Sequence, residues 1–403
     1  MSRILYREAA IVDGRSDRPA LAQSVLVEDG RIAWIRPTDA EPDPRAGGGD
    51  AATVIDAAGA TIVPGMVDAH SHVTLPGGAH WIDRIDDPPA ALLAVAEHNG
   101  ELQSRSGVRW ARDVGAPRAT DPVSGRTQAL SLGVRERWQG RADMPYLRAA
   151  GTWLDKAGTL PPAAHTVEAH DADELLANAI QQLDEGADFL KLYLQGPDPG
   201  VAPWSPDEVA RVTTMAHGRG AKVTAHATAL DEVRAGVLGG VDSIEHGDQI
   251  DEATAAEMAR RGTFLVSTLA VFSSWATFHR TTTLPRFAAE DVPERLAGRL
   301  ETAQASARAA RAAGVRVAAG TDFGGGSLRA NQLAWEVEGL VAAGYEPWEA
   351  LAAATWRGGE LLGEPDAGVI REGGRADFFL VHGDPLSDPS ALWRVWRVAW
   401  LDA

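Results

Sequence analysis

The chain has 403 residues, of which 45% are hydrophobic and 23% charged, a composition typical of a globular protein with room for one large domain and a smaller one. Its 38 basic and 56 acidic residues give a formal charge of −18, which disfavours nucleic acid and anionic membranes as partners. The absence of cysteine excludes disulfides and thiolate ligands, so any metal must be bound through nitrogen and oxygen atoms.

The two ends of the chain have β character. Residues 4 to about 62 form short apolar segments separated by glycine and proline, and the tail after residue 365 is rich in valine, tryptophan and phenylalanine. Two such segments can pair only where the chain ends meet, so we predict one discontinuous β-sandwich domain from residues 1–62 and 365–403. No apolar run approaches the roughly 20 residues that span a bilayer, and we expect a cytoplasmic protein.

Residues 63–364 alternate short apolar strands with longer segments of helical period, a pattern typical of βα units and a parallel sheet. Eight strands are predicted, at 61–70, 108–115, 147–153, 188–194, 222–227, 241–246, 263–268 and 315–322. Candidate helices between them include 89–106, 171–185, 205–218 and 289–313. Eight such units predict an α/β fold, a closed (β/α)8 TIM-like barrel.

Polar residues stand at the C-terminal ends of these strands, where the active site of such a barrel lies. His70 and His72 are two residues apart at the end of the first strand, so their imidazoles point to the same face. One further residue belongs to each of the fourth, fifth, sixth and eighth strands: Lys191, His226, His246 and Asp322. Alone, each of these histidines is typical of a buried, hydrogen-bonded side chain, but together the six residues converge by topology.

Lys191 is the most informative of these residues, because an ammonium ion is unfavourable inside an apolar strand and its pKa should fall. The neutral amine can react with carbon dioxide to form a carbamate, an oxygen ligand able to bridge two metal ions. We therefore predict two divalent ions, with Zn²⁺ favoured over manganese or iron by the nitrogen-rich ligands. Two ions at roughly 3.5 to 4 Å share a water, lower its pKa and polarise the bond to be cleaved.

The predicted ligands divide into two groups around this bridge. His70 and His72 would hold one ion with Asp322, and His226 and His246 would hold the other. Carbamylated Lys191 is then the bridging ligand.

The chain resembles the amidohydrolase superfamily, in the branch of imidazolonepropionase-like enzymes and metal-dependent Xaa-Pro and Xaa-Arg dipeptidases. The resemblance covers nearly the whole chain and is carried, in order, by "VIDAAGATIVPGMVDAHSHV", "ADFLKLYLQG", "AHGRGAKVTAHA", "GGVDSIEHGDQIDE", "AAGTDFG" and "GVIREGGRADFFLVHGDPL". It implies that the same six residues bind the metals. It also implies that Asp322 carries a proton from the attacking hydroxide to the leaving nitrogen.

The chain departs from these relatives after the third strand, where "GTWLDKAGTLPPAAHTV" replaces a Gly-Gly-His motif. His165 is a candidate replacement for the missing histidine, with a surface loop as the favoured alternative. His279, after the seventh strand, is compatible with a place at the barrel mouth. The substrate pocket is therefore expected to differ from that of the dipeptidases.

Tyr193 lies two residues beyond Lys191 and therefore on the same face of the strand, nearer the barrel mouth. We interpret its hydroxyl as a donor to the substrate carbonyl that stabilises the oxyanion, with a packing role as the alternative. Arg112 and Asp113 are expected to form a structural ion pair beneath the site.

The favoured function is a binuclear metal hydrolase that cleaves an amide C–N bond in an N-acyl amino acid or dipeptide. A small cyclic amide, or a lactone or phosphotriester, is the alternative substrate for the same site. A metal-free binding protein is disfavoured because all six ligand positions are occupied by suitable residues. The expected partner is a small amide or peptide substrate, and a homo-oligomer is left open.

Overall fold

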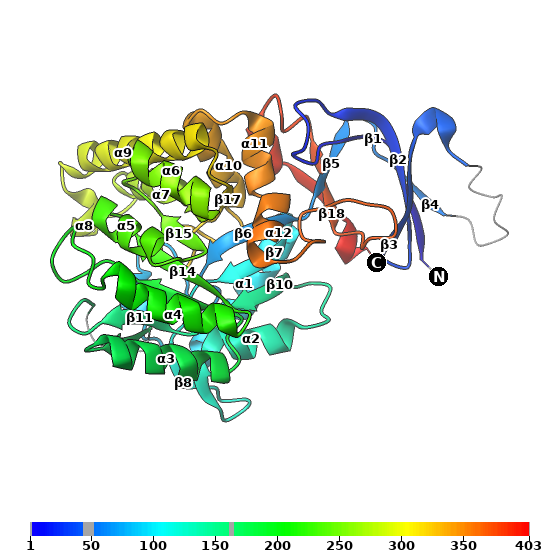
Figure 1. Ribbon diagram of the computed structural model, residues 1–403. Coiled ribbons are helices and arrows are strands. Elements are labelled where there is room, and N and C mark those ends of the chain that lie inside the picture. The colour runs from blue at the N-terminus through cyan, green and yellow to red at the C-terminus, as the bar shows by residue number, and fades with distance from the viewer. Residues whose placement is uncertain (1, 43–51, 161–164, 403) are drawn as a thin grey trace.

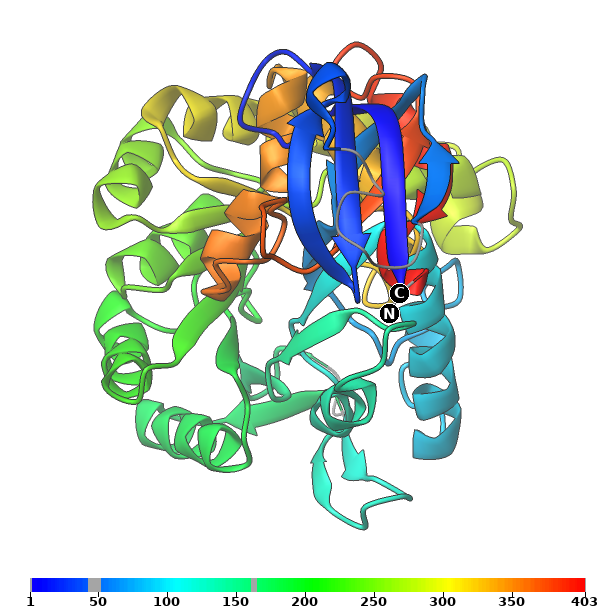
Figure 2. The same cartoon turned by 90° about the vertical axis from the view of Figure 1, so that its right-hand side faces the viewer.

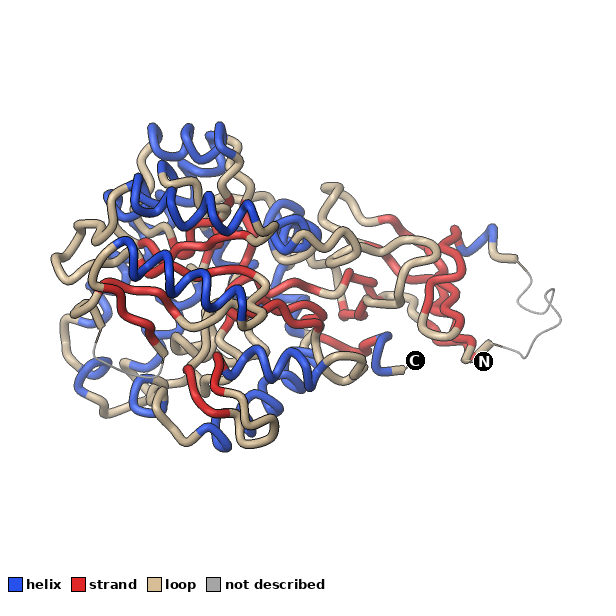
Figure 3. The backbone as a smooth tube through the Cα atoms, turned by 60° about the horizontal axis from the view of Figure 1, so that its bottom comes forward, coloured by secondary structure: helices blue, strands red, loops and turns tan. Residues whose placement is uncertain are grey.

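The computed structural model describes residues 2–42, 52–160 and 165–402. A large α/β part makes up most of the molecule, and a β-sheet projects from one end of it (Figure 1, Figure 3). Both termini lie on this sheet, as the view along it also shows (Figure 2). Among the helices of the described residues, none is both long and apolar enough to cross a membrane.

The projecting sheet contains strands from both ends of the chain. It has seven strands: β1 (Arg3–Ile11), β2 (Ala20–Glu28), β3 (Arg31–Pro37), β4 (Thr53–Asp56), β5 (Ala60–Pro64), β18 (Phe378–His382) and β19 (Val395–Val398). β18 runs antiparallel to β5, with Phe379 opposite Val63. The buried side chains of Tyr6, Ile62 and Phe378 belong to the core of this part.

The predicted sandwich packing of this domain stays a prediction, and hydrogen bonds join all seven strands into one continuous sheet. The reason is the length of β1, which pairs with β4 through residues 4–7 and with β5 through residues 10–11. Glu8, between these two stretches, has a left-handed backbone with φ of 66°. One strand thus serves two partners along the same edge.

The large part contains eight parallel strands: β6 (Met66–Ser71), β7 (Val108–Asp113), β10 (Tyr146–Ala149), β13 (Phe189–Tyr193), β14 (Lys222–Ala227), β15 (Ser243–His246), β16 (Phe264–Ser267) and β17 (Val317–Ala319). Parallel ladders join β6, β7 and β10, and join β13 through β17. Parallel bridges between Ala150 and Phe189 and between Ser71 and Phe323 connect the two sets. The strands therefore follow one another round a ring in chain order, the order of a (β/α)8 barrel.

Helices alternate with these strands: α1 (Pro89–Arg105), α2 (Leu130–Trp138), α3 (Ala172–Asp184), α4 (Pro206–Gly218), α5 (Leu230–Leu238), α6 (Glu252–Arg261), α7 (Ala270–Phe278), α8 (Pro285–Ala288), α9 (Val292–Ala313), α10 (Leu333–Ala342), α11 (Pro347–Ala353) and α12 (Trp356–Leu362). Capping residues in the sequence define several helix starts. Asp171 accepts hydrogen bonds from the first turn of α3, and Ser205 forms a capping box with Glu208 at the start of α4. The remaining short strands are β8 (Arg118–Thr120), β9 (Thr127–Ala129), β11 (Trp153–Lys156) and β12 (Thr166–Ala169).

Gly65 divides the first predicted strand, 61–70, into two strands of different sheets. β5 belongs to the projecting sheet and β6 to the ring. A Cβ at Gly65 would lie 2.6 Å from the Cβ of Arg109. The backbone N–H of Gly65 donates to the carbonyl of Asp377. The chain passes from one sheet to the other where only glycine fits.

A buried ion pair joins the two parts beside Gly65. Arg109 lies at the start of β7, and Asp377 directly precedes β18. The Nε of Arg109 donates to Oδ1 of Asp377 at 2.8 Å. The rest of the guanidinium donates to the carbonyls of Ala142 and Met144 and to the hydroxyl of Tyr146. This arginine therefore depends on one carboxylate for its charge compensation.

We expect Asp377→Ala to lower the free energy of unfolding by about 3 kcal/mol, because it leaves the Arg109 charge buried without its carboxylate. Urea denaturation measures this change. Asp366→Ala is the matched control, since it removes an exposed pair with Arg371 and should change the stability by less than about 0.5 kcal/mol. Equal small changes in both variants would show that the pair does not hold the junction.

Candidate functional site

A cavity of about 660 Å³ opens at the C-terminal ends of the ring strands. Seven residues singled out from the sequence line it: His70, His72, Lys191, Tyr193, His226, His246 and Asp322. They come from β6, β13, β14, β15 and the turn after β17. The structure thus brings all of the expected site residues to one place.

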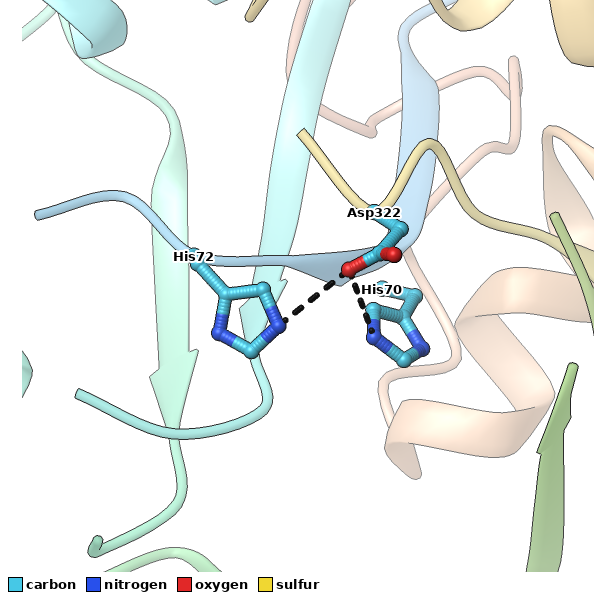
Figure 4. Close-up of side chains that lie close together, drawn as sticks. All are labelled: His70, His72 and Asp322. Carbon is cyan, nitrogen blue, oxygen red and sulfur yellow. Dashed lines mark ion pairs between the residues drawn. The ribbon is translucent and has the colours of Figure 1, made fainter. Parts of the chain in front are cut away.

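His70, His72 and Asp322 form the tightest group (Figure 4). The Nε2 atoms of both histidines lie 3.3 Å from Oδ1 of Asp322. The backbone sets this approach, because the N–H of Asp322 donates to the carbonyl of His70 at 2.8 Å. Burial alone would raise the pKa of Asp322, but hydrogen bonds from the two histidines outweigh it and hold that pKa well below its usual range.

Hydrogen bonds on the outer ring nitrogens orient both imidazoles. Nδ1 of His70 lies 2.6 Å from Oε2 of Glu245, and Nδ1 of His72 lies 2.7 Å from the carbonyl of Gly115. Both acceptors take the Nδ1 proton, so the Nε2 atom of each ring, which faces Asp322, is the one that can give up its own proton to bind a cation. This is the arrangement by which proteins present histidine to a metal ion.

His226, His246 and Lys191 lie beside this group. The ring centroids of His226 and His246 are 4.6 Å apart, and those of His70 and His246 are 4.8 Å apart. Burial lowers the pKa of His246 to about 3 and that of His226 well below its usual value, so both imidazoles are neutral near pH 7. Nδ1 of His246 bonds to Oγ1 of Thr268 at 2.8 Å, which leaves its Nε2 available.

The Lys191 side chain is only 2% exposed. Burial lowers its pKa to about 8, in the direction that its place in an apolar strand predicts. The negative charges of Glu245 and Asp322 oppose this change. A substantial fraction of the amine is therefore neutral and nucleophilic near neutral pH.

Glu245 is a functional residue that the sequence interpretation missed. Its Oε1 accepts hydrogen bonds from Nη2 of Arg112 at 2.5 Å and from Oγ of Ser243 at 2.8 Å, while Oε2 holds His70. Burial would raise its pKa, but the Arg112 charge and the His70 hydrogen bond keep that pKa well below its usual value. A carboxylate inside one of the predicted strands of the parallel sheet was the available signal, although β15, with the sequence "SIEH", is less apolar than the strand that carries Lys191.

The expected ion pair between Arg112 and Asp113 is wrong. Successive side chains of a strand point to opposite faces, so Arg112 faces Glu245 inside the ring. Asp113 instead accepts the backbone N–H groups of Val73 and Gly115 at 2.8 and 3.1 Å. It supports the loop that follows His72.

The backbone is left-handed at two of the candidate ligands. His246 has φ of 71° and Asp322 has φ of 54°, and both stand at the end of a ring strand. Non-glycine residues rarely adopt this conformation, which costs on the order of 1 to 3 kcal/mol when the surrounding structure imposes it. Such strain is concentrated at functional sites.

Aromatic rings form one wall of the cavity. Tyr193 stacks on His226 with a centroid distance of 4.2 Å, and Trp153 lies 5.3 Å from His72 and 5.1 Å from His165. The hydroxyl of Tyr193 donates to Oε1 of Gln195 at 3.2 Å, and burial raises its pKa, so it is a protonated donor at neutral pH. This wall carries both the expected Tyr193 and residues that the sequence did not single out.

His165 lies on the cavity wall, and the favoured prediction of a surface-loop position is wrong. Its ring packs edge-on against Trp153, and its Nδ1 has no hydrogen-bond partner among the described residues. Burial lowers its pKa, so it is neutral at pH 7. His279 is not among the described residues that line the cavity, and its Nδ1 bonds to the carbonyl of Phe287 in α8.

Comparison with known proteins agrees with this geometry. The amidohydrolase family model matches residues 61–398. An uncharacterized protein of Mycobacterium tuberculosis is 32% identical over 366 residues, which cover 89% of this chain and 88% of that protein. An imidazolonepropionase of Salinispora arenicola is 26% identical over 378 residues, which cover 89% and 85%. A solved Xaa-Pro dipeptidase with bound methionine in the active site has the same fold, with a TM-score of 0.80, 24% identity and coverage of 98% of this chain and 97% of that one.

The family match begins within β5 and ends at the last residue of β19, so it includes every cavity residue named above. The relatives named here each align with more than four fifths of both chains. The chain therefore belongs to the amidohydrolase family, in its imidazolonepropionase-like and prolidase-like branch, and is a hydrolase that acts on carbon–nitrogen bonds.

Proposed function

We propose that this chain is a binuclear metal-dependent hydrolase on a (β/α)8 barrel, which cleaves the amide C–N bond of an N-acyl amino acid or a dipeptide. One observation carries the proposal: six metal-ligating or potentially ligating side chains from five places in the ring line a single cavity. The same cavity has apolar walls beside this polar group, as a site for a small organic amide requires.

The donor set fits two divalent ions. His70 and His72 present Nε2 toward Asp322, and the neutral His226 and His246 stand close by. Lys191 lies among these groups with a lowered pKa, which supports its conversion to a carbamate that supplies two oxygen atoms. Zn²⁺ suits such nitrogen-rich ligands. Divalent ions held there would polarise the amide carbonyl and lower the pKa of water.

The protein's own residues provide the proton transfers and the orientation. Asp322 directs Oδ1 to the two histidines, and we assign its carboxylate the transfer of a proton from the attacking water to the leaving nitrogen. Tyr193 would donate its hydroxyl hydrogen to the oxyanion in place of its contact with Gln195. His165, with a free Nδ1, is placed to bind the substrate from the wall of Trp153.

The walls favour an apolar, linear substrate. They include Trp81, Ile82, Ile85, Trp153, Leu160 and Trp275. The similarity to an imidazolonepropionase supports a small cyclic amide as the second candidate substrate. A volume of about 660 Å³ with several large apolar side chains favours the larger linear amide over a compact ring.

The purified protein is expected to contain close to two divalent ions per chain, because six ligands are too many for one tetrahedral site. Elemental analysis gives the number. A chelator should abolish hydrolysis of N-acyl amino acids and dipeptides, and added Zn²⁺ should restore it. One ion per chain with full activity would contradict the binuclear proposal, and faster turnover of lactams, lactones or phosphotriesters would contradict the linear amide.

Lys191→Ala should lose at least one ion and nearly all turnover, because the bridge is removed. A short carboxylic acid that enters the vacated space should restore part of both. Lys191→Arg should not substitute, since a guanidinium keeps its proton and forms no carbamate. Elemental analysis and kcat are measured for each variant.

Lys222→Ala is the matched control for this experiment. Lys222 lies at the start of β14 and donates to main-chain carbonyls at the end of α12, outside the cavity. This variant should keep both ions. An active Lys191→Arg enzyme with two ions and no response to added acid would rule out the carbamate bridge.

Tyr193→Phe should keep both ions but lower kcat about ten- to a hundredfold, as expected for the loss of one oxyanion donor. Steady-state kinetics give kcat, and elemental analysis gives the ion content. Tyr345→Phe removes another buried hydroxyl, which donates to the carbonyl of Ala307, and should leave kcat unchanged. If kcat is also unchanged in Tyr193→Phe, the tyrosine serves only packing.

A further inference from the structure

Arg299 is a cationic residue of the cavity to which the proposed mechanism assigns no role. It extends from α9 and lines the same cavity as the six candidate ligands. Among the described residues that line this cavity, Lys191 is the other lysine or arginine, and it is buried among the ligands. The Arg299 side chain is 46% exposed, so its charge is accessible from the cavity.

Aromatic rings and one carboxylate hold the Arg299 guanidinium in place. Its central carbon lies 4.9 Å from the ring centroid of Phe272 and 5.6 Å from that of Trp275, both on α7. Nη2 donates to Oδ2 of Asp248 at 3.4 Å, a long contact. Among the described residues this is the one hydrogen bond that the Arg299 guanidinium makes, so its other N–H groups can bind a ligand.

Two further arginines lie near Arg299 at this side of the cavity. A smaller adjoining cavity of about 250 Å³ shares Arg299, Trp81 and Trp275 with the main one and is also lined by Arg286 and Arg295. Three arginines thus gather here in a chain whose formal charge is −18. Each of the three has an aspartate partner, Asp248, Asp291 or Asp83, at 3.4 to 4.0 Å. Contacts of this length leave guanidinium N–H groups for an anionic group of a ligand.

The acidic residues nearby contact these arginines at 3.4 Å or more. Asp86 also lines the main cavity, but its charge acts on His165, at the wall of Trp153. Arg295 contacts Asp291 at 3.4 Å, and Arg286 lies 4.0 Å from Asp83, both at exposed positions. Arg299 is the arginine that faces the main cavity.

We infer that Arg299 binds the carboxylate of the substrate, so that the preferred substrates are N-acyl amino acids with an apolar side chain. The inference rests on the proposed amide hydrolase function and narrows its substrate class. A guanidinium held by two rings loses little conformational freedom when it binds a carboxylate, and the charge-assisted hydrogen bonds fix the orientation of the substrate. Trp81, Trp275 and Ile82 would contact the apolar side chain.

The test compares two amides that differ only in the carboxylate: N-acetyl-L-phenylalanine and N-acetyl-2-phenylethylamine. The wild-type, metal-loaded enzyme should prefer the acid. Arg299→Gln should lower kcat/KM for the acid about ten- to a hundredfold, mainly through KM, as expected for the loss of charge-assisted hydrogen bonds. For the neutral amide, kcat/KM should stay within about twofold, because it makes no such bond.

Two further variants separate binding from a structural role. Arg295→Gln removes a neighbouring arginine that does not line the main cavity and should change neither substrate by more than about twofold. Arg299→Lys should recover part of the preference for the acid, because it keeps the charge but loses the planar fork.

The outcomes distinguish this inference from the proposed function. Equal hydrolysis of both amides by the wild type, or an equal loss on both in Arg299→Gln, would overturn the role of Arg299 while the hydrolase function stands. The metal-loaded wild type could also hydrolyse neither amide and no other N-acyl amino acid or dipeptide. That result would overturn the proposed function and with it this inference.

Discussion

The buried carboxylate of Glu245 connects the scaffold to the candidate metal centre. One oxygen accepts hydrogen bonds from Arg112 of β7 and from Ser243 of its own strand, and the other orients His70 of β6. A carboxylate without water is unfavourable unless it is paired, and here the pairing uses three strands of the ring. The position of His70, and through it that of Asp322, therefore depends on a charge balance inside the ring of strands.

The site combines two environments with opposite requirements. Its floor includes His226, His246 and Asp322, whose pKa values are held below their usual range, by burial for the two histidines and by contacts with histidines for the aspartate. Its walls are tryptophan, isoleucine and leucine side chains, which exclude water from a bound substrate. Neutral imidazoles are good ligands for a divalent ion, and burial keeps His226 and His246 neutral. The apolar wall thus contributes to the chemistry of the floor as well as to substrate binding.

The projecting sheet joins the ring of strands at the end opposite to the candidate site. The chain crosses between the sheets at Gly65, and the pair of Arg109 and Asp377 closes the same junction from the C-terminal segment. β6, which carries His70 and His72, begins one residue after this crossing. The sheet formed from both chain ends therefore anchors the first strand of the ring and, through it, the first two candidate ligands.

Much of this architecture follows from local pattern. The alternation of apolar strands with helical segments identifies eight strands and their order, and the polar residues at the strand ends identify the candidate ligands, because strand periodicity and capping are local properties. Lys191 was recognisable because a lysine inside an apolar strand is unusual whatever surrounds it.

Tertiary structure alone decided which side chains face one another. Arg112 pairs with Glu245 rather than with its neighbour Asp113, and His165 reaches the wall of the cavity from beyond β11. Arg299, which the sequence did not single out, lies on α9 and lines the cavity with two rings of α7 beside its guanidinium. Likewise, one long strand, β1, pairs with both β4 and β5 and so joins the strands of both chain ends in one hydrogen-bonded sheet. Contacts between residues distant in the chain depend on how the strands twist and how the ring closes, and no local periodicity encodes those distances.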